Sequence, residues 1–260
     1  GGTRDDFKIK TILPTTFEKL QKSMLMYSEL FLSLITSSII DITDKCEQIQ
    51  QYFSNPQEFG FVSTLAQKGT KGVDGTFFRL RYGCYELENA IHSLKILQHF
   101  KNNSLKVDLI VGAFYANLTP ASFAYSSLKK IFPNLKFTNH VYSIYEDNAK
   151  CGEWENKTRR EILNRVSHIP PLVRPLIAVE GKNILIVTHT PAEGKILKGL
   201  YHFYKKLGAL NVYLSCVGAK NNQLDFSKKP IKYKNLEITV PPLFIYSGPS
   251  SLRHNQKIVS

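Results

Sequence analysis

Residues 183–200 read NILIVTHTPAEGKILKGL, and this stretch decides the fold. Four apolar residues that favour β-structure, Ile184 to Val187, lead into a short polar turn, and a helical pattern opens around Gly194. In α/β proteins, a turn of this kind is an anion site. The first N–H groups of the helix have no intrahelical acceptor, and the helix dipole favours negative charge there. An ordinary βα connection explains the same letters, so this stretch alone leaves both interpretations open.

A second segment of the same form lies upstream, at residues 106–128, KVDLIVGAFYANLTPASFAYSSL. It predicts a strand over Val107–Val111, a turn that starts at Gly112 and a helix opened by Thr119-Pro120. Threonine is a good N-cap, and proline suits the first helical position. We therefore predict an α/β fold over residues 105–250, with a mostly parallel sheet and helices on both faces.

Residues 1–103 are predicted to form a largely helical N-terminal region that packs on an α/β domain of residues 104–260. Helical periodicity runs through residues 14–52. Glycines then punctuate residues 53–83, which predicts loops with short strands. Residues 85–100 return to a helix, whose apolar face we expect to consist of Leu87, Ala90, Ile91, Leu94 and Leu97.

The two strand–turn–helix segments resemble those of type I phosphoribosyltransferases. Residues 108–112 (DLIVG) match the family's first strand, and residues 118–121 (LTPA) match the end of its pyrophosphate loop. Residues 184–187 and Gly194 match the apolar run and the glycine of the loop that holds the ribose 5-phosphate. This resemblance covers roughly residues 105–250. It implies a phosphoribosyltransferase-like fold, a phosphorylated small molecule or nucleotide as ligand and, if the site is active, phosphoribosyl transfer.

The sequence departs from the family at the positions that carry the chemistry. Two acidic residues usually follow the second apolar run, and here Thr188 and His189 stand in their place, with Ala192-Glu193 in place of a threonine pair. In the family, the two carboxylates contact the ribose hydroxyls of phosphoribosyl pyrophosphate, directly or around Mg²⁺. Thr188 and His189 can hydrogen-bond a sugar but cannot supply two negative oxygens to a hard cation. No cofactor is predicted, except Mg²⁺ if the site is catalytic.

The residues expected to bind the ligand lie in or beside the two turns: Gly112, Tyr115, Ala116, Asn117, Thr119, Thr188, His189, Thr190, Ala192, Gly194 and Lys195. The candidate acids and bases are Glu146, Asp147, His189 and Glu193. A neutral His189 suits hydrogen bonding to a ribose hydroxyl or proton transfer near neutral pH, although a loop histidine without a role is the equal alternative. A cation at Lys195 opposes the helix dipole unless an anion lies nearby, which favours a phosphate.

Three further segments contain candidate site residues, and each of these has an ordinary structural interpretation as well. Glu146 and Asp147 follow a predicted strand over Lys136–Tyr145 and are either site carboxylates or exposed loop acids. Arg159 and Arg160 either close over a pyrophosphate as part of a mobile loop or lie on the solvent-exposed face of an amphipathic helix. Phe244 and Tyr246 either stack on a base or belong to an ordinary strand. The sequence alone decides none of these.

The amino-acid composition favours a folded protein with anionic partners and argues against a membrane-spanning or disulfide-bonded one. The 260 residues are 43% hydrophobic and carry a net charge of +13, which favours anionic partners such as nucleotides or nucleic acid, although the charges are dispersed. No apolar run is long enough for a membrane span, and we expect none. The four cysteines show neither CxxC nor metal-ligand spacing. We therefore predict reduced thiols, a cytoplasmic location and no metal site. An oligomer is compatible with the sequence.

Two classes of function follow. The first is a phosphoribosyltransferase-like protein that binds a nucleotide or phosphoribosyl-type anion through the two loops, with a remodelled site that is either active or inactive. The second is a non-catalytic regulator or effector that binds nucleic acid or a protein partner. An unrelated Rossmann-like enzyme is disfavoured because no GxGxxG follows either strand.

Overall fold

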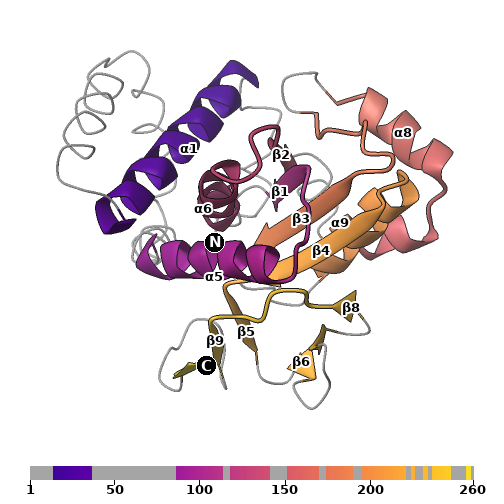
Figure 1. Ribbon diagram of the computed structural model, residues 1–260. Helices are drawn as coiled ribbons and strands as arrows, with labels where there is room; N and C mark the ends of the chain where they lie inside the picture. The colour runs from indigo at the N-terminus through magenta and orange to yellow at the C-terminus, as the bar shows by residue number, and fades with distance from the viewer. Residues whose placement is uncertain are drawn as a thin grey trace, which may run out of the picture.

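The computed structural model describes residues 14–36, 86–113, 118–140, 151–169, 174–189, 195–220, 224–225, 231–233, 236–246 and 256–258. The helices of these ranges are α1 (Pro14–Thr36), α5 (Glu86–Asn102), α6 (Leu118–Lys129), the short 3₁₀ helix η4 (Cys151–Asn156), α8 (Arg159–Ser167) and α9 (Lys195–Lys206) (Figure 1). The main strands are β1 (Leu109–Ala113), β2 (Lys136–His140), β3 (Asn183–Thr188) and β4 (Asn211–Cys216). Shorter strands follow: β5 (Gly218–Lys220), β6 (Leu224–Asp225), β7 (Lys232–Tyr233), β8 (Leu236–Glu237), β9 (Phe244–Tyr246) and β10 (Gln256–Ile258).

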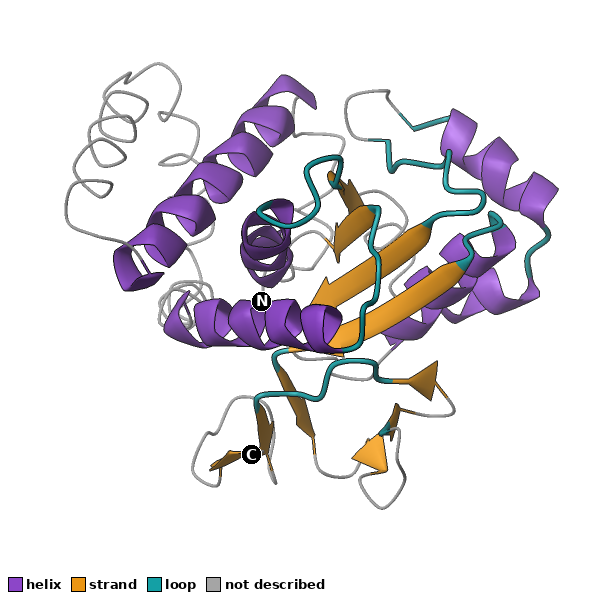
Figure 2. Ribbon diagram, viewed as in Figure 1, coloured by secondary structure: helices purple, strands orange, loops and turns teal. Residues whose placement is uncertain are grey.

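The four main strands form one parallel sheet in the order β2-β1-β3-β4. Val111 pairs with Ile186 at the centre, so the two strands predicted from the sequence are direct neighbours. Helices lie on both sides of this sheet, as Figure 2 shows. The predicted fold class is therefore confirmed: a parallel sheet with helices on both faces.

Successive side chains of each strand point to opposite faces of the sheet, and a hydrophobic core lies on each face. On one face, Ile184 and Ile186 of β3 pack against α9, together with α8 and η4. On the other face, Leu185 and Val187 pack against α5 and α6. Strands that are buried on both faces need near-continuous apolar sequence, which is why ILIV at 184–187 is uninterrupted.

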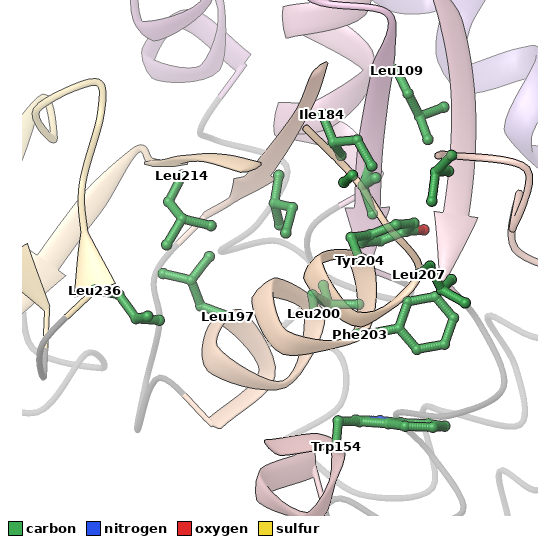
Figure 3. Packing of buried hydrophobic residues seen from close by; sticks show 14 of the residues in the cluster. Leu109, Trp154, Ile184, Leu197, Leu200, Phe203, Tyr204, Leu207, Leu214 and Leu236 are labelled. Atoms are coloured by element: carbon green, nitrogen blue, oxygen red, sulfur yellow. The ribbon is translucent and has the colours of Figure 1, made fainter. Parts of the chain in front are cut away.

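Helix α9 and the residue that follows it line the first core along one side. Their apolar residues recur at helical spacing and lie beneath the strands (Figure 3): Leu197, Leu200, Phe203, Tyr204 and Leu207. Trp154 of η4 covers this helix from outside, with its ring 5.2 Å from that of Phe203 in an edge-on geometry. Such aromatic pairs contribute about 0.5–1.5 kcal/mol beyond the area that they bury.

The N-terminal helices cover the opposite face. Helix α1 packs on α6, where Phe31 meets Phe123 with ring centroids 5.7 Å apart and the hydroxyls of Ser28 and Ser126 lie 2.8 Å apart. Helix α5 belongs to the second core itself, because its Ile96 and Phe100 are buried against the sheet. The division between residues 1–103 and 104–260 stays a prediction, and residues 37–85 lie outside the described ranges.

Two small three-stranded sheets extend the fold beyond β4, and the sequence analysis did not predict them. One has the order β10-β9-β5, and the other has the order β6-β7-β8. Strand β5 follows β4 directly, so the first small sheet lies past the carboxyl end of the main sheet. Residue Val240 forms a bridge to Ser215 and covers the outer edge of β4.

Element boundaries differ from the prediction by one or two residues. Strand β1 runs from Leu109 to Ala113, so Gly112 lies inside the strand and not in the turn. Helix α6 begins at Leu118, so Thr119 lies in its first turn. The predicted strand over residues 136–145 is observed up to His140, and residues 141–150 lie outside the described ranges.

A left-handed glycine ends α9. Gly208 has φ +91°, its N–H donates to the carbonyl of Lys205, and the N–H of Ala209 donates to that of Tyr204. This pair of bonds is the Schellman arrangement, which satisfies the last carbonyls of the helix. A Cβ at Gly208 would lie 3.3 Å from Cγ of Glu180.

We expect Gly208→Ala to lower the free energy of unfolding by about 1–2 kcal/mol, because an alanine at positive φ is strained. Gly181, at φ +69° with no atom within 4 Å of the place that a Cβ would take, is the matched control. Gly181→Ala carries the backbone strain alone, so its loss should be smaller in urea unfolding. Equal losses in the two variants would show that the contact with Glu180 has no effect.

Candidate functional site

The connections of the sheet reverse direction between β1 and β3. Strand β1 leads through α6 to β2 on one side, whereas β3 leads through α9 to β4 on the other, with the two helices on opposite faces. In open α/β sheets, ligands bind at such a switch point, beyond the carboxyl ends of the strands. The ends of β1 and β3 emerge there side by side, and α6 and α9 begin a few residues later.

Much of the predicted ligand set falls outside the described ranges. These residues are Tyr115, Ala116, Asn117, Glu146, Asp147, Thr190, Ala192, Glu193 and Gly194. Of the others, Thr188 ends β3, His189 follows it, and Lys195 is the first residue of α9. The structure thus places Gly112, Thr119, Thr188, His189 and Lys195 at the same edge of the sheet, in the elements that flank the two turns.

Buried polar side chains without partners gather at this edge. Asn139 of β2 pairs in register with Gly112 of β1, is only 3% exposed, and neither its oxygen nor its nitrogen has a hydrogen-bond partner among the described residues. The hydroxyl of Thr188 is buried and, within the same ranges, also lacks a partner. Leaving such a group unpaired costs about 1–3 kcal/mol, so these positions call for an explanation.

Backbone hydrogen bonds hold Thr188 and His189 in place at the end of β3. The carbonyl of Thr188 accepts from the N–H of Val217 at 3.0 Å, and that of His189 accepts from the N–H of Gly218 at 2.9 Å. Both side chains are buried. Alternation along β3 places Thr188 on the α9 side of the sheet and His189 on the α5 side.

Helix α5 adds a group of polar residues that the sequence analysis missed. Nε2 of His92 lies 2.7 Å from the hydroxyl of Ser215 on β4, and both side chains are buried. Burial, followed by the nearby charges of Lys95 and His189, lowers the pKa of His92 to about 3, so its imidazole is neutral at physiological pH. One turn earlier, the side-chain oxygen of Asn89 is buried and lacks a partner within the described ranges.

The predicted apolar face of α5 is confirmed at Ala90, Leu94 and Leu97, which are buried or packed against a hydrophobic cluster, and is wrong at Leu87 and Ile91. Leu87 is 54% exposed and Ile91 is 42% exposed, whereas Asn89, His92 and Ser93 are buried. The first half of the helix passes over the polar carboxyl edge of the sheet and packs Ala90 against α1 and α6. The second half, with Ile96 and Phe100, crosses the second core. Hydrophobic periodicity alone cannot find a helix face that buries polar groups.

The side chains where the strands end are neutral donors and acceptors. None of the last two residues of β1, β2, β3 or β4 is Asp or Glu. Within the described ranges, no group of three His, Cys, Asp or Glu side chains is arranged to hold a metal ion. Amide, hydroxyl and neutral imidazole groups suit sugar hydroxyls, phosphate oxygens and base edges, and they are poor ligands for Mg²⁺.

Arg159 and Arg160 lie in a helix. Thr158 caps α8 in a capping box with Glu161, Ile162 is buried, and both arginines are exposed, as the amphipathic-helix interpretation expects. The guanidinium of Arg159 pairs with the carboxylate of Glu180 at 2.8 Å. Glu180 precedes β3, so this pair lies near the amino edge of the sheet, about 17–20 Å from the carboxyl edge by the rise of six strand residues.

Phe244 and Tyr246 are the first and last residues of β9, which pairs with β5 beyond the carboxyl end of β4. Their strand therefore lies on the ligand side of the main sheet. Whether either ring stacks on a base stays a prediction.

The neutral His92 predicts a dependence of stability on pH. Its folded pKa of about 3 lies below the ordinary 6.5, so between these values the unfolded chain binds a proton that the folded chain does not. The free energy of unfolding should then fall as pH falls, by up to about 1.4 kcal/mol per pH unit from this group. We expect His92→Asn to reduce that slope in urea unfolding between pH 7 and pH 4. His168→Asn, at an exposed histidine, is the control, and an unchanged slope in His92→Asn would contradict the assignment.

No family model and no curated protein matches the sequence. Solved structures of phosphoribosyltransferases are similar to 52% of this chain. A purine phosphoribosyltransferase from Pyrococcus horikoshii Ot3 has 17% identity and a TM-score of 0.34, with 75% of its chain covered. A glutamine mutant of an HPRT, made to analyse an invariant aspartic acid, has 13% identity and a TM-score of 0.37, with 67% covered. Hypoxanthine phosphoribosyltransferase from Trypanosoma cruzi, complexed with the product IMP, has 12% identity and a TM-score of 0.33, with 64% covered.

These neighbours are of the same class as the family that the two sequence motifs resemble. Likenesses of this size decide neither the ligand nor the reaction. The α/β architecture is established by the sheet of this chain itself. No helix within the described ranges is long and apolar enough to cross a membrane.

Proposed function

We propose that this chain is a phosphoribosyltransferase-like protein that binds a nucleotide or phosphoribosyl-type anion at the carboxyl edge of its sheet, between β1 and β3. The turns after these strands, residues 112–119 and 188–195, would supply backbone N–H groups at the starts of α6 and α9. Both helix dipoles direct their positive ends to this edge, which favours a phosphate there.

The observation that carries the proposal is the buried amide of Asn139, which has no hydrogen-bond partner among the described residues. A buried amide without hydrogen bonds lowers the stability of the unliganded protein, and such groups in folded proteins commonly mark sites that a ligand or water completes. Asn139 lies beside Gly112, where the absence of a side chain lets a ligand approach the backbone of β1. The buried hydroxyl of Thr188 has the same property at the end of β3.

The neutral character of the edge favours binding over ordinary transfer. Without carboxylates at 188 and 189, the Mg²⁺-bound ribose hydroxyls of a normal donor lack their usual partners. Two unpaired groups at about 1–3 kcal/mol each reduce donor affinity by roughly two orders of magnitude or more. We therefore propose weak or absent phosphoribosyl transfer. Should turnover with a common base be brisk, Glu146, Asp147 and Glu193 are the first carboxylates to replace by alanine.

Asn139→Ala separates a ligand-binding role from a structural one. Because the amide has no partner in the described part of the chain, its removal should leave the unliganded protein as stable or more stable. Calorimetric titration with phosphoribosyl pyrophosphate, or with a mononucleotide, should show affinity reduced by about tenfold, as expected for one lost hydrogen bond.

Thr138→Val is the matched control for that experiment. Thr138 is the preceding residue of β2, and its hydroxyl accepts the N–H of Leu176 at 2.9 Å on the other side of the sheet. This substitution should lower stability and leave ligand affinity unchanged. Loss of stability in Asn139→Ala with unchanged affinity would show that the amide has only a structural role.

The double substitution Thr188→Asp with His189→Asp tests the alignment with the family's acidic pair. Both positions are buried, so two carboxylates should lower the stability of the free protein. Addition of Mg²⁺ with phosphoribosyl pyrophosphate should recover that stability, seen as a larger rise in melting temperature than in the wild type. Equal rises in both proteins, in a double variant that still folds, would show that these positions do not face the donor.

A further inference from the structure

The amino edge of the main sheet, opposite the proposed ligand edge, is lined by lysines. They lie in the last turns of α5, α6 and α9 and in the segments that lead into the strands, and we refer to them as the amino-edge lysines: Lys101, Lys106, Lys129, Lys130, Lys136, Lys182 and Lys205. All are exposed except Lys182, which is partly exposed. The surface is therefore strongly positive.

Hydrogen bonds between neighbouring segments show that this surface is continuous. The N–H of Lys136 donates to the carbonyl of Asp108, and the N–H of Asp108 donates to that of Asn183. On the other side, the N–H of Leu210 donates to the carbonyl of Lys182. Four strands at about 4.8 Å spacing span about 15 Å, and a helix layer extends the surface on each side.

Little negative charge offsets these lysines. Asp108 and Glu180 lie beside these lysines and are both engaged, whereas Glu155 and Glu161 lie near Lys206 at the end of α9. The carboxylate of Asp108 accepts from the backbone and side-chain N–H groups of Asn183 at 2.8 and 3.0 Å, and that of Glu180 pairs with Arg159. Within the same ranges, no ion pair is formed by Lys101, Lys106, Lys130, Lys136 or Lys182.

Helix dipoles account for only part of the charge. A lysine in the last turn of a helix is favoured by about 0.3–1 kcal/mol, which explains Lys101, Lys129 and Lys205. Lys129 and Lys205 also donate to carbonyls of the following turns, Leu135 at 3.2 Å and Leu210 at 2.9 Å. Lys106 and Lys182 precede strands and Lys136 begins β2, so no helix end favours them. Helix dipoles therefore do not explain why lysines occupy these three positions.

We propose that the amino-edge lysines bind the phosphate backbone of nucleic acid. Duplex DNA carries one charge per about 1.7 Å of its axis, so a surface of this width faces several phosphates at once. Exposed amides lie among the lysines, at Asn102, Asn103 and Asn134, and can donate to phosphate oxygens. A membrane surface fits less well, because insertion needs an apolar face and Leu210 is the one large hydrophobic side chain exposed at this edge within the described ranges.

This surface is independent of the proposed ligand site. The two lie at opposite ends of the same strands, about 17–20 Å apart by the rise of β3. Nucleic acid at the amino edge therefore leaves the carboxyl edge open, and a phosphorylated ligand can occupy the other end of the molecule at the same time. Binding to nucleic acid can also hold if the ligand proposal fails.

The test is the salt dependence of binding to a fluorescently labelled DNA duplex and to a labelled single-stranded RNA. Fluorescence anisotropy would follow binding of the whole chain between about 50 and about 200 mM salt. We expect Lys106→Gln with Lys136→Gln to reduce the slope of log K against log salt by about 1.8 for the duplex, near 0.9 for each lost phosphate contact. Lys22→Gln with Lys232→Gln removes the same net charge from exposed positions elsewhere and should leave the slope nearly unchanged.

Three outcomes would overturn the proposal. One is an equal effect of both pairs, which would mean diffuse attraction by the net charge. Another is the absence of binding to either nucleic acid at low salt. The third is binding to anionic phosphatidylserine vesicles that depends on Lys106 and Lys136, without binding to nucleic acid. Titration of the amino-edge pair with phosphoribosyl pyrophosphate should match the wild type, so failure here and failure of the ligand proposal are separate results.

Discussion

The structure depends on one parallel pairing, that of β1 with β3. These strands are separated by α6, β2 and α8 in the chain, yet Leu109, Ile110 and Val111 lie opposite Ile184, Leu185 and Ile186. The pairing is maintained by burial on both faces, since each strand contributes side chains to both cores. Once it forms, right-handed crossovers place α6 and α9 on opposite faces, and the ends of the two strands define the switch point. This arrangement determines both the carboxyl edge of the sheet, with its buried polar side chains, and the amino edge, with its lysines.

The sequence predicted those parts of the fold that are apolar and regular. The runs at 109–111 and 184–187 are too apolar to be anything but buried, and they gave both central strands. It predicted the strand that carries Phe244 and Tyr246 but not the two small sheets, because strands of two residues, such as Leu224–Asp225, are too short to show alternation. It also missed the contribution of α5 to the site. Asn89 and His92 are buried although the apolar pattern of the helix does not include them, and Leu87 and Ile91, which fit that pattern, face solvent.

The burial of polar residues on α5 is informative because these residues lie at the carboxyl edge of the sheet. A sequence selected only for stability would place apolar side chains at Asn89, His92 and Asn139, where burial is nearly complete. Instead, amide and hydroxyl groups without partners in the described part of the chain are kept here, with a net cost to the free protein. Natural proteins retain such conflicts mainly where function requires them. The neutral His92, held against Ser215, indicates a site built from hydrogen bonds and not from charge.

In a parallel α/β sheet, the helix dipoles give the two edges opposite electrostatic potentials. Helices run antiparallel to the strands, so their positive N-termini collect at the carboxyl edge and their negative C-termini at the amino edge. Lysines accumulate at the second edge partly because helix ends favour them, as with Lys101 and Lys205. The carboxyl edge is already positive through the N-termini of α6 and α9, and it would attract an anion without any lysine in its buried polar layer. Thr188 and His189, where β3 ends, carry no carboxylate that would oppose this field. Under the proposed function, this edge holds a phosphate without a divalent cation, because the helices that form the fold supply the positive field on their own.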